Sequence, residues 1–285
     1  MDEMTALPLL RHAIRCAGLR GCATAPVKHS WLLCALVPAV LLTCTAANAV
    51  SAGSELRVPI LVYHRFGPVV ADSMTVTTPV FESHLRYLKD NGYLVISLKQ
   101  LVGCFLGTAS PPPPRSVVIT ADDGHRSVYT EMLPLVVRYH VPVTVFIYPS
   151  AISRAHYALT WEQLSALQRT GLFDIQSHTY WHPNFKKEKR RLAPRAYEEF
   201  VTAQLTKSRD QLQEQLGVRV DMLAWRTGRV SHSHRVHCAK TELVTARPGG
   251  SVHEAPLAAR VPARLPMSDT AASRATFSWL AVYCR

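Results

Sequence analysis

The stretch Ser116-Val-Val-Ile-Thr-Ala-Asp-Asp-Gly124 decides the fold class of this 285-residue chain. It begins with β-branched residues, the pattern of a buried strand, and ends in two carboxylates and a glycine that can turn the chain. On both sides of it, short apolar runs alternate with helical patterns. This alternation predicts a parallel sheet or a βα barrel, in which functional side chains gather where strands end at their carboxyl edge.

Other strands are predicted wherever a short apolar run is bounded by turn residues. These runs cover residues 58–63, 93–98, 141–148, 173–177 and 218–225. A polyproline segment at 111–114 predicts a stiff surface linker.

Four helices are predicted between these strands from their caps and apolar spacing. The first helix is capped by Thr78, carries Phe81, Leu85 and Leu88 on one face, and ends at Gly92. The second covers 126–140 and is kinked by Pro134. The third opens with the capping box at Thr160–Gln163 and ends at Gly171, and the fourth runs from Pro194 to Gly217. Beyond Trp225 the period is lost and His and Arg crowd residues 226–240. We therefore expect an α/β fold, either a parallel sheet or a βα barrel, that loses its regularity after about residue 225.

Composition narrows the classes of protein. A hydrophobic fraction of 48% excludes a disordered chain, and 7 cysteines are too few for a disulfide scaffold. The absence of apolar runs of about 18 residues excludes a multi-span membrane protein. The net charge of +12 admits nucleic acid, anionic lipid or an acidic polymer as partner. No element carries the basic and aromatic stripe of a nucleic-acid reader, so we expect no nucleic acid.

Residues 1–49 have the pattern of a signal peptide. Basic residues precede the apolar stretch Trp31–Cys44, and Ala47-Asn48-Ala49 supplies a cleavage site. The alternatives are an uncleaved N-terminal anchor, which is the one expected route to a membrane, and lipidation of Cys44. The remaining domain is residues 50–285, and the expected location is the periplasm, the cell envelope or the extracellular space. Three cysteines remain after cleavage and allow at most one disulfide: Cys104, Cys238 and Cys284.

The first candidate group is the carboxylate pair Asp122 and Asp123. Neighbouring residues of an extended chain point in opposite directions, so one carboxylate can face a metal ion while the other faces the reacting water. The alternative is an Asp-Asp-Gly turn or helix cap without chemistry.

The second candidate group is the histidine pair His178 and His182, which follows the predicted strand at 173–177. A spacing of four brings two imidazoles together if the segment begins a helical turn. Neutral imidazoles suit a divalent cation such as Zn²⁺. The alternative is two ordinary loop histidines. One aspartate and two histidines together make a three-ligand set with an open position.

These two motifs resemble those of the polysaccharide deacetylases, the NodB-homology domain of carbohydrate esterase family 4. Thr120-Ala-Asp-Asp-Gly124 is similar to the Thr-Phe-Asp-Asp-Gly motif of that family, with Ala121 in place of Phe, and Ser177-His-Thr-Tyr-Trp-His182 is similar to its His-Ser/Thr-x-x-His motif. Val143–Phe146 and Leu159–Trp161 also fit. The likeness runs from about Val58 to Trp225 and, among family members, is nearest to the poly-β-1,6-N-acetylglucosamine N-deacetylases.

The resemblance implies a distorted (β/α) barrel of the NodB-homology type, irregular or incomplete after about residue 225, and a role for each of these residues. Asp122 would be the general base, and Asp123, His178 and His182 would hold the metal, with Zn²⁺, Co²⁺ and Ni²⁺ all suited to them. Leu61-Val-Tyr-His64 looks like a further motif of the poly-β-1,6-N-acetylglucosamine group, which would make His64 the general acid; the alternative is a structural histidine. The implied reaction is N-deacetylation of N-acetylglucosamine units in an envelope or extracellular polysaccharide, with release of acetate.

The third motif of the family is altered. Ala224-Trp-Arg-Thr-Gly228 lacks the expected Pro-Tyr pair, which leaves Thr227 as a doubtful donor for the oxyanion turn. One extra nucleotide after the Trp225 codon would restore Trp-Pro-Tyr-Gly, so we expect a frameshift that ends before about Thr245. The histidines and cysteine of 232–238 are then out-of-frame or loop sequence rather than a second metal site. The alternative function is a catalytically impaired glycan-binding protein of the same fold.

Overall fold

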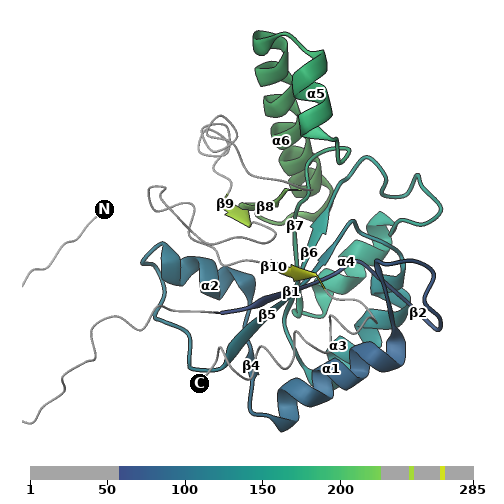
Figure 1. Cartoon of the computed structure of the whole chain (residues 1–285), viewed down its shortest axis with the longest axis vertical. Coiled ribbons are helices and arrows are strands. Elements are labelled where there is room, and N and C mark those ends of the chain that lie inside the picture. The colour runs from purple at the N-terminus through teal and green to yellow at the C-terminus, as the bar shows by residue number, and fades with distance from the viewer. Residues whose placement is uncertain (1–57, 226–243, 247–263, 267–285) are drawn as a thin grey trace, which may run out of the picture. The chain divides into compact units, whose positions relative to one another are not determined.

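Parallel strands form the main sheet of the computed structural model, which describes residues 58–225, 244–246 and 264–266 (Figure 1). The strand order is β10-β1-β5-β6-β7-β8-β9, and β4 pairs with β5 outside this path. The strands are β1 (Ile60–Tyr63), β4 (Leu94–Val95), β5 (Ser116–Asp122), β6 (Val143–Ile147), β7 (Phe173–Ser177), β8 (Met222–Ala224), β9 (Val244–Ala246) and β10 (Arg264–Pro266). The expected α/β architecture, a curled parallel sheet with flanking helices, is confirmed.

Helices connect these strands as parallel pairing requires. They are α1 (Thr78–Asp90), α2 (Leu98–Phe105), α3 (Leu133–Tyr139), α4 (Trp161–Arg169), α5 (Phe185–Arg191) and α6 (Pro194–Leu216), with a π-helical turn, η1 (Val128–Met132), before α3. A separate parallel ribbon pairs β2 (Arg65–Gly67) with β3 (Thr75–Thr77). None of the helices in the described part of the chain combines the length and the apolar content that a membrane span requires.

The two faces of the sheet bury different sets of residues because side chains alternate along each strand. Leu61 and Ile119 belong to the larger core, which also includes the apolar faces of α1, α4 and α6. Ile60 and Val118, their immediate neighbours, belong to a second core with Leu98 of α2. The odd-numbered and even-numbered positions of β1 and β5 therefore face opposite sides.

Local signals set the ends of two helices as predicted. Thr160 and Gln163 form the expected capping box at the start of α4. Pro194 lies in the first turn of α6, and Gly217 ends this helix in the left-handed conformation at φ 64°. The strand predicted at 173–177 is β7 itself.

Other local predictions were wrong. Thr77, not Thr78, is the residue before α1, and it makes no side-chain cap. The strand predicted at 93–98 shrinks to β4 because Ser97 caps a new helix, α2, by accepting from Gln100 N. The helix predicted at 126–140 begins as the π-helical turn η1, and Pro134 lies in the first turn of α3 instead of kinking a longer helix.

Several predictions concern residues that the structure does not describe. They are the signal peptide and its boundary after Ala49, the cysteines Cys238 and Cys284, and the altered motif from Arg226 onward, including Thr227. Cys104, which is described, forms no disulfide with another described residue.

Candidate active site

The carboxyl ends of the central strands place three of the predicted site residues side by side. Tyr63 pairs with Ala121 across β1 and β5, so His64 and Asp122 follow at the same level. Ile147 of β6 pairs with Ser177 of β7, and His178 N donates to Ile147 O at 2.7 Å. Strands that end level deliver their next side chains to one edge, as predicted for this fold.

Asp123 reaches the same site through an unusual backbone. It adopts φ 72°, in the left-handed region that few residues other than glycine favour. This turn brings its carboxylate to the same imidazole as Asp122: His178 Nε2 lies 3.8 Å from Asp122 Oδ2 and 3.5 Å from Asp123 Oδ1. The prediction that the two carboxylates point in opposite directions was therefore wrong.

Gly124 allows this turn for two reasons. Its own φ is 69°, and a Cβ at this position would lie 2.7 Å from Ile147 Cδ1. A side chain here would meet both backbone strain and a steric clash with the core. The positive φ and the close approach of the Ile147 side chain thus both favour glycine at this position of the motif.

The two histidines converge without a helical turn. Residues 178–184 are irregular, and Thr179 and His182 adopt φ 70° and φ 60°. The rings of His178 and His182 nevertheless lie with centroids 4.6 Å apart. The predicted convergence is confirmed, but the predicted helical turn was wrong.

Asp123, His178 and His182 have the geometry of a cation site. Each offers one ligand atom, and all three atoms lie within 4.8 Å of one another. Asp123 Oδ1 is buried without a hydrogen-bond partner among the residues that the structure describes, at 3.5 and 3.7 Å from the Nε2 atoms of His178 and His182. These separations are too long for good hydrogen bonds but suit ligands that face a common ion. The donor set therefore fits a divalent cation of the Zn²⁺ type.

The tautomer of His178 also fits this use. Its Nδ1 lies 2.7 Å from the carbonyl oxygen of Ala224 at the end of β8. A carbonyl can only accept, so Nδ1 carries the proton and the neutral imidazole presents the Nε2 lone pair to the site. Such backing of a histidine ligand is usual around bound metals.

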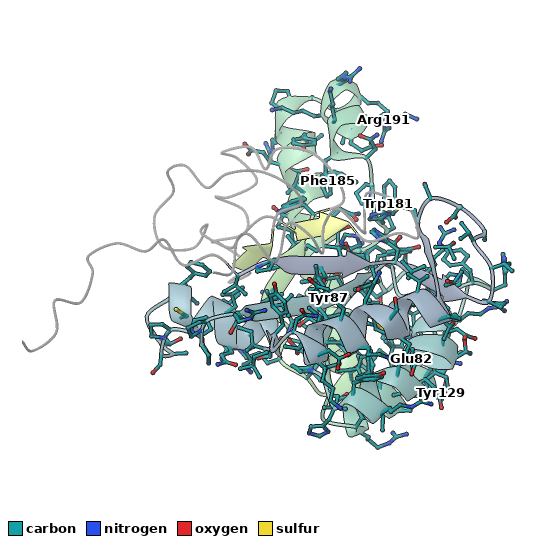
Figure 2. The ribbon with its side chains drawn as sticks, turned by 60° about the horizontal axis from the view of Figure 1, so that its bottom comes forward. Glu82, Tyr87, Tyr129, Trp181, Phe185 and Arg191 are labelled. Atoms are coloured by element: carbon teal, nitrogen blue, oxygen red, sulfur yellow. The ribbon has the colours of Figure 1, made fainter. Side chains whose placement is uncertain are left out.

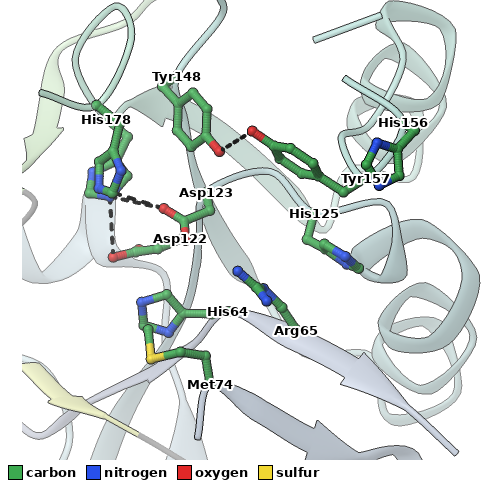
Figure 3. A pocket seen from close by; sticks show the side chains of 11 residues that line it. His64, Arg65, Met74, Asp122, Asp123, His125, Tyr148, His156, Tyr157 and His178 are labelled. Atoms are coloured by element: carbon green, nitrogen blue, oxygen red, sulfur yellow. Dashed lines mark hydrogen bonds and ion pairs between the residues drawn. The ribbon is translucent and has the colours of Figure 1, made fainter. Parts of the chain in front are cut away.

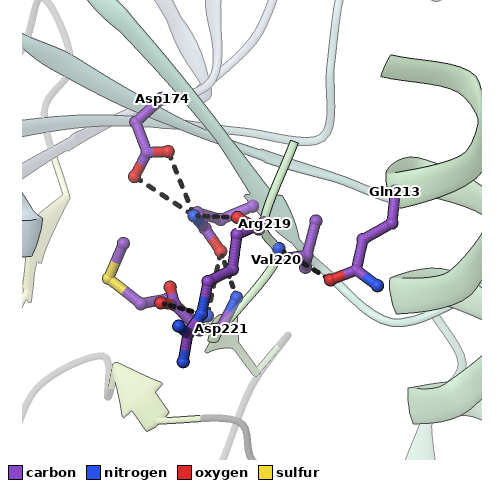
Figure 4. A network of polar contacts seen from close by, with 7 residues as sticks. Asp174, Gln213, Arg219, Val220 and Asp221 are labelled. Carbon is purple, nitrogen blue, oxygen red and sulfur yellow. Dashed lines mark hydrogen bonds and ion pairs between the residues drawn. The ribbon is translucent and has the colours of Figure 1, made fainter. Parts of the chain in front are cut away.

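The buried side chain of Gln176 holds β8 against β7, in a polar network that includes Asp174 and Asp221 (Figure 4). Backbone pairing between these strands is limited to Ser177 with Leu223. Gln176 Oε1 accepts from the backbone N–H groups of Asp221 at 3.0 Å and Met222 at 2.9 Å, while its Nε2 donates to Asp174 at 3.0 Å. The side chain thus replaces missing ladder bonds next to the Ala224 carbonyl.

Charges shift the pKa values inside the site. Burial lowers the pKa of the His178 imidazole, but the charges of Asp122 and Asp123 outweigh burial and raise it. Burial also raises the pKa of the Asp123 carboxyl, and its histidine neighbours, led by His178, bring this pKa below its usual range. A cation would displace the His178 proton, so binding should weaken as the pH falls.

The site lies in a cavity of about 740 Å³ (Figure 3). His64, predicted as the general acid, lines it together with both carboxylates and both histidines. Thr227 is not described. Six further lining residues were missed from the sequence: Arg65, Met74, His125, Tyr148, His156 and Tyr157.

Aromatic contacts organise the part of the cavity that the sequence did not predict. Tyr148 stacks on His182 with centroids 5.2 Å apart, and its hydroxyl lies 3.0 Å from that of Tyr157.

Arg65, another lining residue, pairs with Asp72, which also accepts from Thr75 Oγ1 at 2.8 Å. Arg65 follows His64 directly in the sequence, which is the one signal that could have indicated it.

The family model and two relatives that are similar in sequence all carry the name of a polysaccharide deacetylase or of a poly-β-1,6-N-acetyl-D-glucosamine N-deacetylase. Residues 109–246 match the family model described as polysaccharide deacetylase. The Bacillus subtilis protein YxkH, whose name assigns it to the polysaccharide deacetylases, is 32% identical over 126 residues, which is 44% of this chain and 43% of YxkH. The poly-β-1,6-N-acetyl-D-glucosamine N-deacetylase of Escherichia coli is 27% identical over 140 residues, or 43% of this chain and 20% of that protein. The matched segment thus spans less than half of each of these relatives.

Solved structures agree on the fold. A de-N-acetylase from Aggregatibacter actinomycetemcomitans has a TM-score of 0.62 at 20% identity, covering 77% of this chain and 98% of that one. IcaB from Ammonifex degensii has a TM-score of 0.64 at 18% identity, covering 78% and 96%. At these identities the likeness establishes the architecture alone.

Proposed function

We propose that this chain, whose residues 109–246 match the polysaccharide deacetylase family model, is a metal-dependent hydrolase that removes acetyl groups from N-acetylglucosamine units of a polysaccharide. The observation that carries this proposal is the convergence of Asp123, His178 and His182 beside Asp122 and His64 in one cavity. Metal-assisted amide hydrolysis uses a general base, a general acid and a cation held by ligands with an open position. Asp122, His64 and the three-ligand set match these three parts.

Asp123, His178 and His182 would hold the cation. When bound, a divalent cation supplies Lewis-acid polarisation of a carbonyl and lowers the pKa of water. Zn²⁺ is the first candidate, because two imidazoles and one carboxylate suit it, and Co²⁺ and Ni²⁺ are compatible with the same donors.

The residues of the chain account for the proton transfers. Asp122, buried at 4% exposure, would take a proton from the attacking water while the water oxygen bonds to the acetamide carbon. The C–N bond then breaks, and protonated His64 would give its proton to the leaving nitrogen. Acetate and a free glucosamine amine result. Thr227 remains the candidate for a backbone N–H facing the oxyanion.

The substrate we propose is an envelope or extracellular glycan, with β-1,6-linked N-acetylglucosamine favoured. The support is the Leu61–His64 motif and the enzymes of that name among the relatives. Residues 1–49 carry the signal-peptide pattern that would deliver the protein to such a polymer.

Acetate release from acetylated glucosamine oligomers, measured together with metal content, tests the proposal. The wild-type protein should bind about one divalent ion per chain and release acetate. Asp122→Asn should keep the metal and lose release, whereas Asp123→Ala should lose both. Release by Asp122→Asn at the wild-type rate would remove the proposed base.

A glycan-binding protein without turnover is the second candidate, favoured by the altered motif at Ala224–Gly228. It predicts bound metal and bound oligomer with no acetate. The nucleotide sequence around the Trp225 codon tests the frameshift directly, and restoring Trp-Pro-Tyr-Gly should then raise activity.

A further inference from the structure

A strongly basic helix face stands next to the active site. Lys186, Lys187, Lys189 and Arg190 of α5 are all exposed, and we call them the basic face of α5. Within the described part of the chain, none of these four makes an ion pair, whereas Arg191 pairs with Glu188 at 2.6 Å. The basic face therefore presents four cations within five residues that form no ion pair with a described carboxylate.

This helix is fixed to the active site by its buried side. Phe185 packs against Trp225 with ring centroids 4.8 Å apart and against Phe200 at 5.9 Å. Trp225 directly follows Ala224, whose carbonyl oxygen holds His178. In Figure 2, Trp181 lies nearest the sheet, and Phe185 and Arg191 follow along α5 away from the sheet.

The chain limits how far the start of the basic face lies from the site. Lys186 comes four residues after His182, so their Cα atoms are at most about 15 Å apart, and the other three cations follow further along α5. This separation exceeds the screening length of about 10 Å at 0.1 M salt but falls within the length of about 30 Å at 0.01 M salt. The lysines therefore act on charges at the site, most strongly at low salt.

Deacetylation changes the charge of the polymer close to the basic face of α5. Each turnover replaces a neutral acetamide by an amine, and amines of this kind carry a proton near neutral pH. Sugar units that have already reacted thus bring positive charge next to the basic face of α5, while acetylated units bring none. Like charges at this range weaken binding.

We propose that the basic face of α5 makes the enzyme discriminate against segments that already carry free amines, so that it acts on acetylated stretches and leaves the polymer partly deacetylated. This inference rests on the proposed function. It assigns the discrimination to α5, outside the residues that perform the chemistry.

The test compares two matched double variants, Lys186→Gln/Lys187→Gln on α5 and Lys89→Gln/Lys99→Gln. All four lysines are exposed, and the control pair belongs to α1 and α2. Initial acetate release is measured at neutral pH and 10 mM salt on two probes, a fully acetylated β-1,6-N-acetylglucosamine oligomer and the same oligomer with half of its amines freed. Circular dichroism melting checks that both variants are folded.

The wild-type protein should favour the fully acetylated probe. The α5 variant should reduce this preference by about twofold to fivefold through faster action on the half-deacetylated probe, and about 1 M salt should remove the difference between the proteins. The control variant should keep the wild-type preference at low salt.

Equal preference ratios in the wild-type and α5 variants at low salt would overturn the inference while leaving the deacetylase proposal intact. A loss of preference in the control variant would also overturn it, because net charge and not α5 would then be responsible. Absence of acetate release from the acetylated probe by the wild-type protein would instead refute the proposed function.

Discussion

Replacing Gln176 by leucine should weaken both the fold and the metal site, because this side chain links β7 to β8. The leucine variant leaves unpaired the backbone N–H groups of Asp221 and Met222, which in the wild-type protein donate to Gln176 Oε1 at 3.0 and 2.9 Å. A buried donor without a partner costs about 1–3 kcal/mol, so two cost about 2–6 kcal/mol of unfolding free energy. Urea denaturation measures this loss.

The effect should extend to metal binding through Ala224. If β8 moves, its carbonyl oxygen no longer fixes the tautomer of His178, and loss of such backing typically costs about 10- to 100-fold in metal affinity. Competition with a zinc chelator in native buffer measures the affinity of the folded fraction. Wild-type affinity in a destabilised Gln176→Leu protein would refute the link between Gln176 and His178.

A charge exchange supplies the control. Gln176→Glu keeps an acceptor for both N–H groups but places a carboxylate against Asp174, so it should destabilise the protein. Adding Asp174→Asn returns a donor to the pair and should recover most of the lost stability, a coupling of about 0.5–3 kcal/mol. A double variant no more stable than Gln176→Glu would show that the polar network contributes nothing here.

Four further outcomes follow from the same structure. His64→Asn should lower kcat for acetate release by about 10²- to 10⁴-fold with unchanged metal content, whereas His140→Asn, outside the cavity, should leave kcat unchanged. Chelation should lower thermal stability, and Zn²⁺ at 100 times its Kd should restore about 2.7 kcal/mol, a gain that Asp123→Ala should abolish. Gly124→Ala should destabilise more than Gly92→Ala in urea unfolding, because both glycines have positive φ but only at Gly124 would a Cβ meet the core. Burial raises the pKa of Asp174, so ionisation disfavours the folded state as the pH rises through that pKa; Asp174→Asn should raise the melting temperature near neutral pH, and an unchanged gain at acid pH would contradict this assignment.

Strand alternation and strand ends made much of the site predictable from the sequence. The buried runs at 116–122 and 173–177 located the two motifs, and the parallel sheet required their carboxyl ends to meet. Asp122 is the last residue of β5, and His64 and His178 directly follow β1 and β7. All three have even numbers, the parity of Ile60 and Val118 in the core beside α2. Pattern alone could therefore place these three residues on one edge.

The short elements and the rest of the cavity were not predictable in this way. The strands β2 and β3 have three residues each and α5 has seven, too few for a hydrophobic period to appear. Tyr148 and Tyr157 meet because the chain after β6 folds back along the cavity, and no spacing in the sequence encodes that path. Such tertiary contacts arise only when several loops pack together.

Half of the non-glycine departures from regular backbone geometry in the described residues lie at or next to the cation ligands. Asp123, Thr179 and His182 are three of the six described non-glycine residues with positive φ, and each such residue costs about 1–3 kcal/mol. Had the chain stayed extended at Asp123, its carboxylate would have pointed away from Asp122 and the site would have lacked its third ligand. The buried strands and Gly124 hold this strained turn in place, so the stability of the core offsets the strain that positions Asp123 Oδ1 between the two histidines. The strand pattern consequently predicts Asp122 and His178, whereas Asp123 and His182 depend on turns that this pattern does not encode.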